Sequence, residues 1–339
     1  MIITENVSWR RNVNTLLKSC MRGEFWKKSG PILGLLVLLG LFQTASGGIF
    51  LSADMMGATS AFISGLGVVA IGVTMLMICG EYDLSVSQSF VLPAIVMGAL
   101  ITRFDFSVAL ALGIALVVAL VIGLTNGIIT VYFKVDSFIV TLAMLLILTS
   151  LTLTIATTNP PNILGISSPI LVALGGGVLG SSVKAPFIWL LLIAVVLTIV
   201  LSASRFGNWT RAAGVRRGHA ALAMGVPVRL VKVCNFCLCS TLSGFAGIAL
   251  VANIGVARND LGQNLNLLAI VAAVIGGASL FGGRGSVLGA VVGAFVLGVL
   301  SSGLIVTGID QQFYIGVVGA VLLVAAYINI RLSGREKGG

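Results

Sequence analysis

The feature that most constrains this chain is a succession of unbroken apolar runs, each about 17–25 residues long, which is the length of a helix that crosses a bilayer. Only 9% of its residues are charged, against about 25% in soluble domains. A soluble fold of 339 residues could not bury this much apolar surface. Within lipid only helices or closed barrels satisfy the backbone, and the runs lack the alternation of barrel strands. The sequence therefore predicts an all-α polytopic membrane protein.

The apolar runs divide into ten segments, and two of them are irregular. The third contains Pro93, and the eighth is interrupted by Gly276-Gly277 and Gly282-Gly283, so we expect a broken or re-entrant helix there. The 43 glycines predict close helix contacts, because small residues let backbones approach. The segments lie at about 31–47, 57–79, 86–102, 106–131, 138–157, 186–202, 233–255, 267–282, 287–307 and 312–330.

The distribution of basic residues predicts the topology. With the N-terminus in the cytoplasm, every Lys and Arg except Arg103, Lys184 and Arg258 falls on the cytoplasmic side. We therefore predict about ten transmembrane helices with both termini cytoplasmic. The domains are a cytoplasmic segment 1–30, a transmembrane permease domain 31–330 and a cytoplasmic tail 331–339. The net charge of +10 fits loops beside lipid headgroups, not a nucleic-acid-binding protein, since no basic stripe carries interleaved aromatics.

The chain carries no pattern typical of catalysis. It lacks a phosphate-binding G-x-x-x-x-G-K-[ST] loop, a zinc-protease H-E-x-x-H and a G-x-S-x-G motif. Cys234, Cys237 and Cys239 cluster in an apolar run, where we expect buried thiols and no metal site. We therefore expect no enzyme activity, and neither cofactor nor metal on this chain.

Uncharged polar residues inside the spans are candidates for a translocation pathway. Each could hydrogen-bond the hydroxyl groups of a solute, or hold two helices together. The sequence leaves both roles open. No convincing buried ionisable residue is expected, which counts against an ion-coupled secondary transporter. The candidates are Asn126, Thr141, Asn253, Asn264, Asn266 and Ser302.

Two connections are long, and one of them is strongly basic. Residues 158–185 are external and are expected to carry a short helix. Residues 203–232 form an internal loop with six basic residues and no acid. Small residues and the flexible Met224 favour docking of a partner, and the alternative is a loop that binds headgroups. Gly80-Glu81-Tyr82-Asp83-Leu84-Ser85-Val86-Ser87 joins two spans on the inside, where Asp83 or Ser85 could cap the next helix or take part in coupling.

These residues carry a resemblance to a known family. Gly80–Val86 resembles the G-G-I-D-L-S-V-G signature of sugar permeases in the ribose/xylose/autoinducer-2 class of ABC importers. Gly123–Gly127 is similar to the G-x-x-N-G of that family, and residues 134–142 to its K-I-P-x-F-I-V-T-L. The strongest match is Ala269–Ser286. The family-signature residues are Glu81, Asp83, Ser85, Gly276, Gly277, Gly282, Gly283 and Arg284.

The resemblance implies a type II ABC importer-like permease in the bacterial inner membrane. Such a permease pairs with a second permease subunit, a cytoplasmic ABC ATPase that binds ATP and Mg, and a periplasmic solute-binding protein. The solute would be a monosaccharide or a related small polar molecule. The resemblance also implies an ATPase-coupling loop at about 203–232, with Arg211, Gly214, Arg216, Arg217, His219, Ala220, Ala221, Met224 and Gly225 as its site residues.

This chain departs from the family pattern in the coupling loop. Arg216, Arg217 and Gly218 replace a glycine, an asparagine and an acidic residue. Ser87-Gln88 and Asp136-Ser137 also differ from the usual residues. Two alternatives to a sugar permease stay open: an ABC permease for a branched-chain amino acid or nucleoside, and an ion-coupled secondary transporter.

Overall fold

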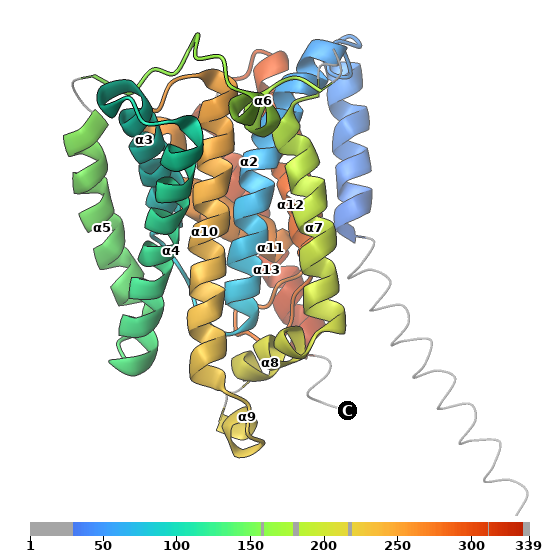
Figure 1. The fold of residues 1–339 in the computed structure, drawn as a ribbon. Coiled ribbons are helices and arrows are strands. Elements are labelled where there is room, and N and C mark those ends of the chain that lie inside the picture. The colour runs from blue at the N-terminus through green and yellow to red at the C-terminus, as the bar shows by residue number, and fades with distance from the viewer. Residues whose placement is uncertain (1–29, 157–158, 179–182, 216–218, 311, 335–339) are drawn as a thin grey trace, which may run out of the picture.

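The protein is a helical bundle in a computed structural model that describes residues 30–156, 159–178, 183–215, 219–310 and 312–334 (Figure 1). Within these ranges there is no named strand, and the only extended pairings are two isolated bridges, Asn162 with Val256 and Gly177 with Lys184. Both bridges connect loops and leave the bundle itself entirely helical.

Each of the ten predicted apolar segments corresponds to a helix. Seven of the described helices are long and apolar enough to cross a membrane. The helices are Gly30–Ala45, α2 (Ala53–Ile78), α3 (Val86–Phe104), α4 (Val108–Tyr132), α5 (Ser137–Ala156), α7 (Ala185–Ala203), α10 (Val228–Ile254), α11 (Leu265–Ile275), α12 (Val287–Val306) and α13 (Gln312–Gly334). The expected short external helix is α6 (Pro169–Gly175), and the basic loop contains α8 (Arg205–Gly214) and α9 (His219–Ala223).

Helix α2 forms the centre of the bundle, and α5 lies at its edge (Figure 1). In α2, 83% of the most apolar stretch is buried inside the protein, against 22% in α5. A helix that is apolar on all sides is suited to a core. The predicted close helix contacts are present: a Cβ at Gly247 of α10 would lie 1.8 Å from the Phe90 carbonyl oxygen of α3. Glycine therefore sets the spacing between these helices.

The eighth segment is broken, as predicted, but mainly ahead of its helix. The connection from α10 runs inward along α3: a Cβ at Gly98 would lie 3.5 Å from that of Ala257, and one at Gly262 would lie 2.5 Å from the Ser87 carbonyl oxygen. At 1.5 Å per helical residue, these two points on α3 are about 16 Å apart. The 3₁₀ turn η2 (Asn259–Gly262) lies in this connection. Helix α11, only 11 residues long, thus begins beside the first turn of α3, a helix long enough to cross a membrane.

Candidate functional site

The connection between α2 and α3 is anchored to three other parts of the bundle. Lys232 Nζ of α10 lies 2.5 Å from Glu81 Oε1, and both side chains are largely buried. The Tyr82 hydroxyl donates a hydrogen bond to the Leu280 carbonyl, and the Tyr82 backbone N–H donates to Ser137 Oγ of α5 at 3.3 Å. One short loop therefore contacts α5, α10 and the loop that follows α11.

The carboxylate of Asp83 is fully buried in this connection, with 1% of the residue exposed. Its Oδ1 accepts hydrogen bonds from the Ser85 backbone N–H at 2.8 Å and the Ser85 hydroxyl at 2.6 Å, and its Oδ2 accepts one from Ser240 Oγ at 3.5 Å. Asn126 Nδ2 of α4 donates to Ser85 Oγ at 2.9 Å. The cluster thus links α3, α4 and α10 through polar contacts.

Asp83 corrects the expectation that the chain carries no buried ionisable residue. The sequence could not show this burial, because the connection reads as an ordinary polar turn. We expected Asp83 or Ser85 to cap α3. Ser85 does occupy the N-cap position, but its side chain makes no capping hydrogen bond. Instead, Asp83 Oδ1 accepts a hydrogen bond from the Ser85 backbone N–H. The hydrogen-bond partners that we find for this carboxylate are not ionisable, so they do not form a proton relay of the kind used by ion-coupled transporters.

The end of α8 packs against the bundle through closely spaced backbone. A Cβ at Gly214 would lie 2.0 Å from the Ile78 carbonyl oxygen and 2.5 Å from the Gly283 nitrogen. These two atoms are joined by a Gly283 N–H to Ile78 C=O hydrogen bond of 2.8 Å. Gly80 and Gly282 pack against the same point. The backbone of α8 is thus in direct contact with the end of α2 and with the 276–286 loop, so a shift of α8 acts on both of these neighbours.

Helices α8 and α9 lie at the end of the bundle opposite α6, and α9 extends farthest from it (Figure 1). Arg211 Nη1 donates to the Leu201 carbonyl at 2.8 Å, which fixes α8 against the end of α7. Ala220 is exposed and Ala221 is buried, and Met224 is 74% exposed. Gly225 ends this turn with φ of 77°. Arg216 and Arg217 lie outside the described residues, as does the side chain of His219.

Comparison with known proteins identifies the family. The model of the family "Branched-chain amino acid transport system / permease component" matches residues 55–326. The chain belongs to this permease family. The permease is 34% identical over 309 residues to the ribose import permease protein RbsC of Bacillus subtilis, covering 91% of this chain and 94% of that protein.

Two further relatives have a similar level of identity. The permease is 31% identical to the fructose import permease protein FrcC of Rhizobium meliloti, over 88% of this chain and 84% of that protein. It is also 31% identical to the xylose/arabinose import permease protein XylH of Sulfolobus acidocaldarius, over 86% and 82%. No solved structure matches. The predicted class, a multi-pass ABC permease with a transport role, is confirmed by the family match.

The permease does not bring its six pathway candidates together. Asn126 and Thr141 are fully buried, and Thr141 Oγ1 donates to the Ser137 carbonyl of its own helix at 2.7 Å. Ser302 is buried in α12. Asn253 Nδ2 donates to the Gly175 carbonyl at 2.6 Å and holds α10 to α6. Only Asn264, which is exposed, and Asn266, which is half-buried, lie together, at the start of α11.

The remaining signature residues shape the loop after α11. A Cβ at Gly276 would lie 2.2 Å from the backbone of Gly289 in α12. Gly277, Gly282 and Gly283 have positive φ, a conformation that glycine adopts without strain. The Arg284 carbonyl accepts a hydrogen bond from the Ser279 N–H at 2.9 Å. These contacts give the signature a structural role beside α12.

Several polar residues of the interior are missed by sequence reasoning. They are Lys232, Ser240 and Gln88, whose Oε1 accepts a 3.0 Å hydrogen bond from Thr152 of α5. Arg258 and Asp260 also form an ion pair at 3.0 Å. The two charges read as part of an outer loop. One sequence signal for this position was available. The eighth apolar run is too short to cross a bilayer by itself, so the polar residues before it must supply about half of the crossing.

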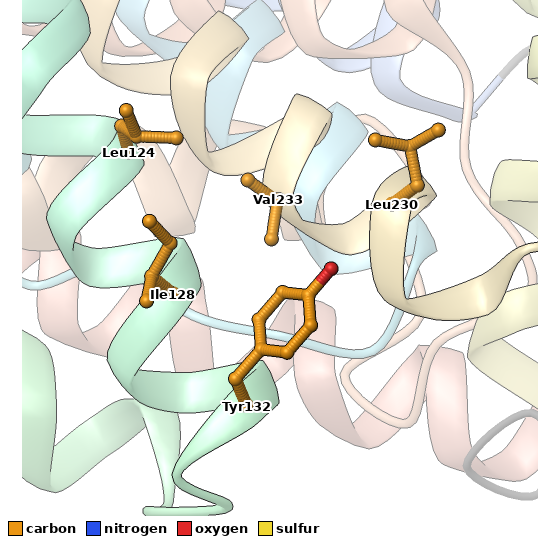
Figure 2. Close-up of a pocket in the computed structure, with 5 residues that line it drawn as sticks. All are labelled: Leu124, Ile128, Tyr132, Leu230 and Val233. Atoms are coloured by element: carbon orange, nitrogen blue, oxygen red, sulfur yellow. The ribbon is translucent and has the colours of Figure 1, made fainter.

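An apolar groove opens between the inner halves of α4 and α10. The two helices meet at Gly123, where a Cβ would lie 2.5 Å from the Phe236 carbonyl oxygen, and leave a groove of about 440 Å³ beside this crossing. Figure 2 shows the Tyr132 hydroxyl pointing across the groove toward α10. The lining residues are Leu124, Ile128, Tyr132, Leu230 and Val233. Because Tyr132 provides the only polar side chain, this groove suits hydrocarbon and not a sugar.

Proposed function

We propose that this permease is the membrane-spanning subunit of an ATP-driven importer in a bacterial inner membrane, with both termini cytoplasmic. It would translocate a monosaccharide or a related small polar solute that a periplasmic binding protein delivers. The relatives named as ribose, fructose and xylose/arabinose import permeases support this substrate class, because the likeness extends over most of each chain.

The observation that carries the mechanism is the backbone junction at Gly214. A cytoplasmic ABC ATPase, which would bind the ATP and Mg, docks on the stretch that includes α8 and α9. Nucleotide binding and hydrolysis move this stretch, and the junction passes the motion to α2 and to the 276–286 loop. Two permease subunits then rock between outward-open and inward-open states, each favoured by a different state of the partners. The roles of Arg216, Arg217 and His219 in docking remain part of this proposal.

The test is transport in proteoliposomes. The permease is reconstituted with the ATPase and the binding protein that co-purify with it, and uptake of labelled D-ribose, D-xylose and D-fructose is measured. We expect uptake to require hydrolysable ATP and to persist when a protonophore collapses the proton gradient. Uptake that continues without ATP and stops with the protonophore would instead indicate a secondary transporter.

A double charge reversal tests the docking stretch. We expect Arg216→Glu with Arg217→Glu to abolish ATP-driven uptake and to leave membrane insertion intact. The matched control is Arg331→Glu with Arg335→Glu, which reverses two charges near the C-terminus and should leave uptake unchanged. Wild-type uptake by the Arg216/Arg217 variant would remove the coupling assignment.

A second substrate class follows from the description of the family, which names branched-chain amino acids. Binding of labelled leucine, and no sugar, to the neighbouring binding protein would favour this class. The ATP-driven mechanism would be unaffected by that outcome.

A further inference from the structure

The connection from α10 to α11 places non-helical backbone inside the membrane. Its turn η2 packs on α3 near Ser87, which is the second residue of that helix. Helix α11 starts only after this point, at Leu265. The first half of the eighth span is therefore made of residues 255–264.

This connection also exposes polar side chains on the surface of the single subunit. Arg258 and Asp260 form a two-bond ion pair, with Nη2 to Oδ2 at 3.0 Å and Nε to Oδ1 at 3.1 Å. Their side chains are 57% and 54% exposed. Gln263 and Asn264, the next polar residues, are exposed as well.

Lipid cannot be the neighbour of this surface. A charged side chain at the centre of a bilayer is strongly disfavoured. Non-helical backbone at membrane depth is tolerated only where protein covers it or where it lines a water-filled cavity. Asp83 is covered by protein in this way, since it is completely buried. The exposed pair of Arg258 and Asp260 therefore requires a water-filled cavity.

We propose that Arg258, Asp260, Gln263 and Asn264 form the sugar-binding wall of an aqueous cavity, which the permease encloses with a second permease subunit. The guanidinium donates hydrogen bonds and the carboxylate accepts them, so the pair can bind two adjacent hydroxyl groups. The side-chain amides of Gln263 and Asn264 can both donate and accept hydrogen bonds. An exposed ion pair contributes little to stability, so it can exchange its partners for those of a sugar. This site rests on the proposed function.

Water access tests the cavity without sugar, ATP or partners. We would introduce Gln263→Cys and treat the membrane-embedded permease with a membrane-impermeant methanethiosulfonate reagent. Modification is read at that position by peptide mass spectrometry. The control is Leu146→Cys, where the native leucine is 66% exposed on the apolar helix α5 and we expect it to face lipid. Because only the hydrated thiolate reacts, we expect Gln263→Cys to react at least about tenfold faster than the control.

Transport tests the sugar contact. At saturating binding protein, we expect Asp260→Asn and Arg258→Gln each to lower the maximal rate of sugar uptake by about 10–100-fold, the range for losing a hydrogen bond to a charged group. Thermal stability and assembly with the ATPase should be unchanged, which a structural role would not predict. Asp54→Asn, at an exposed aspartate beginning α2, serves as the control and should transport normally.

The outcomes separate this inference from the proposed function. Unmodified Gln263→Cys in a permease that transports, or wild-type uptake by both charge variants, would overturn the cavity wall and leave the importer standing. Rapid modification in a permease for which ATP drives no sugar uptake would overturn the proposed function instead.

Discussion

Substitution of Gly214 by alanine is expected to disconnect α8 from the bundle. The added Cβ would lie 2.0 Å from the Ile78 carbonyl oxygen, so α8 must move away by more than 1 Å to reach an ordinary contact of about 3.4 Å. Overpacking of this kind costs about 1–3 kcal/mol, and loss of the adjacent Gly283–Ile78 hydrogen bond adds about 1 kcal/mol. The native junction should thus be destabilised by about 2–4 kcal/mol.

The assay compares apparent melting temperature, ATPase assembly and ATP-driven uptake. Uptake should fall at least tenfold, since 1.4 kcal/mol already changes an equilibrium tenfold. Assembly with the ATPase should persist because the exposed surface of α9 is unchanged. The matched control is Gly113→Ala in α4, where no heavy atom lies within 4 Å of the new Cβ and alanine favours the helix by about 1 kcal/mol. Wild-type uptake and melting temperature in Gly214→Ala would refute the junction as a coupling element.

Three further predictions concern side-chain contacts between segments. Asp83→Ala should destabilise the permease by about 3 kcal/mol, because the donors of Ser85 and Ser240 lose their acceptor, whereas Asp83→Asn should cost less; equal melting temperatures for all three proteins would contradict this. Lys232→Met should destabilise the permease by about 3 kcal/mol, because it leaves Glu81 unpaired. Adding Glu81→Gln should restore much of the lost stability, and a double-mutant cycle on melting temperatures measures this. Arg103→Ala removes hydrogen bonds to the Ile155 and Asn159 carbonyls, and should speed hydrogen exchange at the outer end of α5 while that of α2 is unchanged.

The long apolar runs predict most of the helices of this fold. All ten segments become helices because lipid leaves the backbone no alternative within a long apolar run. The glycines of 276–283 correctly predict an interruption, since four of them interrupt one run. The course of residues 255–264 along α3 was not predicted, because its one sequence signal, the shortness of the eighth apolar run, also fits an external loop.

The candidate site is harder to predict than the fold, because its parts come together only in three dimensions. Asp83 and Asn126 belong to separate sequence motifs, and their common partner Ser85 is what joins them. The ion pair of Glu81 with Lys232 spans 151 positions of the chain. A polar turn and a lipid-flanking lysine are the ordinary interpretations of these residues, and no local pattern favours their pairing.

The two irregular connections solve the same physical problem in opposite ways. Both place a carboxylate just before a helix, Asp83 ahead of α3 and Asp260 ahead of α11. At Asp83 the protein supplies the hydrogen-bond donors, which joins the start of α3 to α4 and to the middle of α10. At Asp260 the side-chain donor that we find is Arg258, and about half of each of these two side chains is exposed. In the proposed importer these two arrangements would have different tasks: the sealed Asp83 cluster would hold α3, α4 and α10 together, and the open pair of Arg258 and Asp260 would exchange its hydrogen bonds with a passing solute.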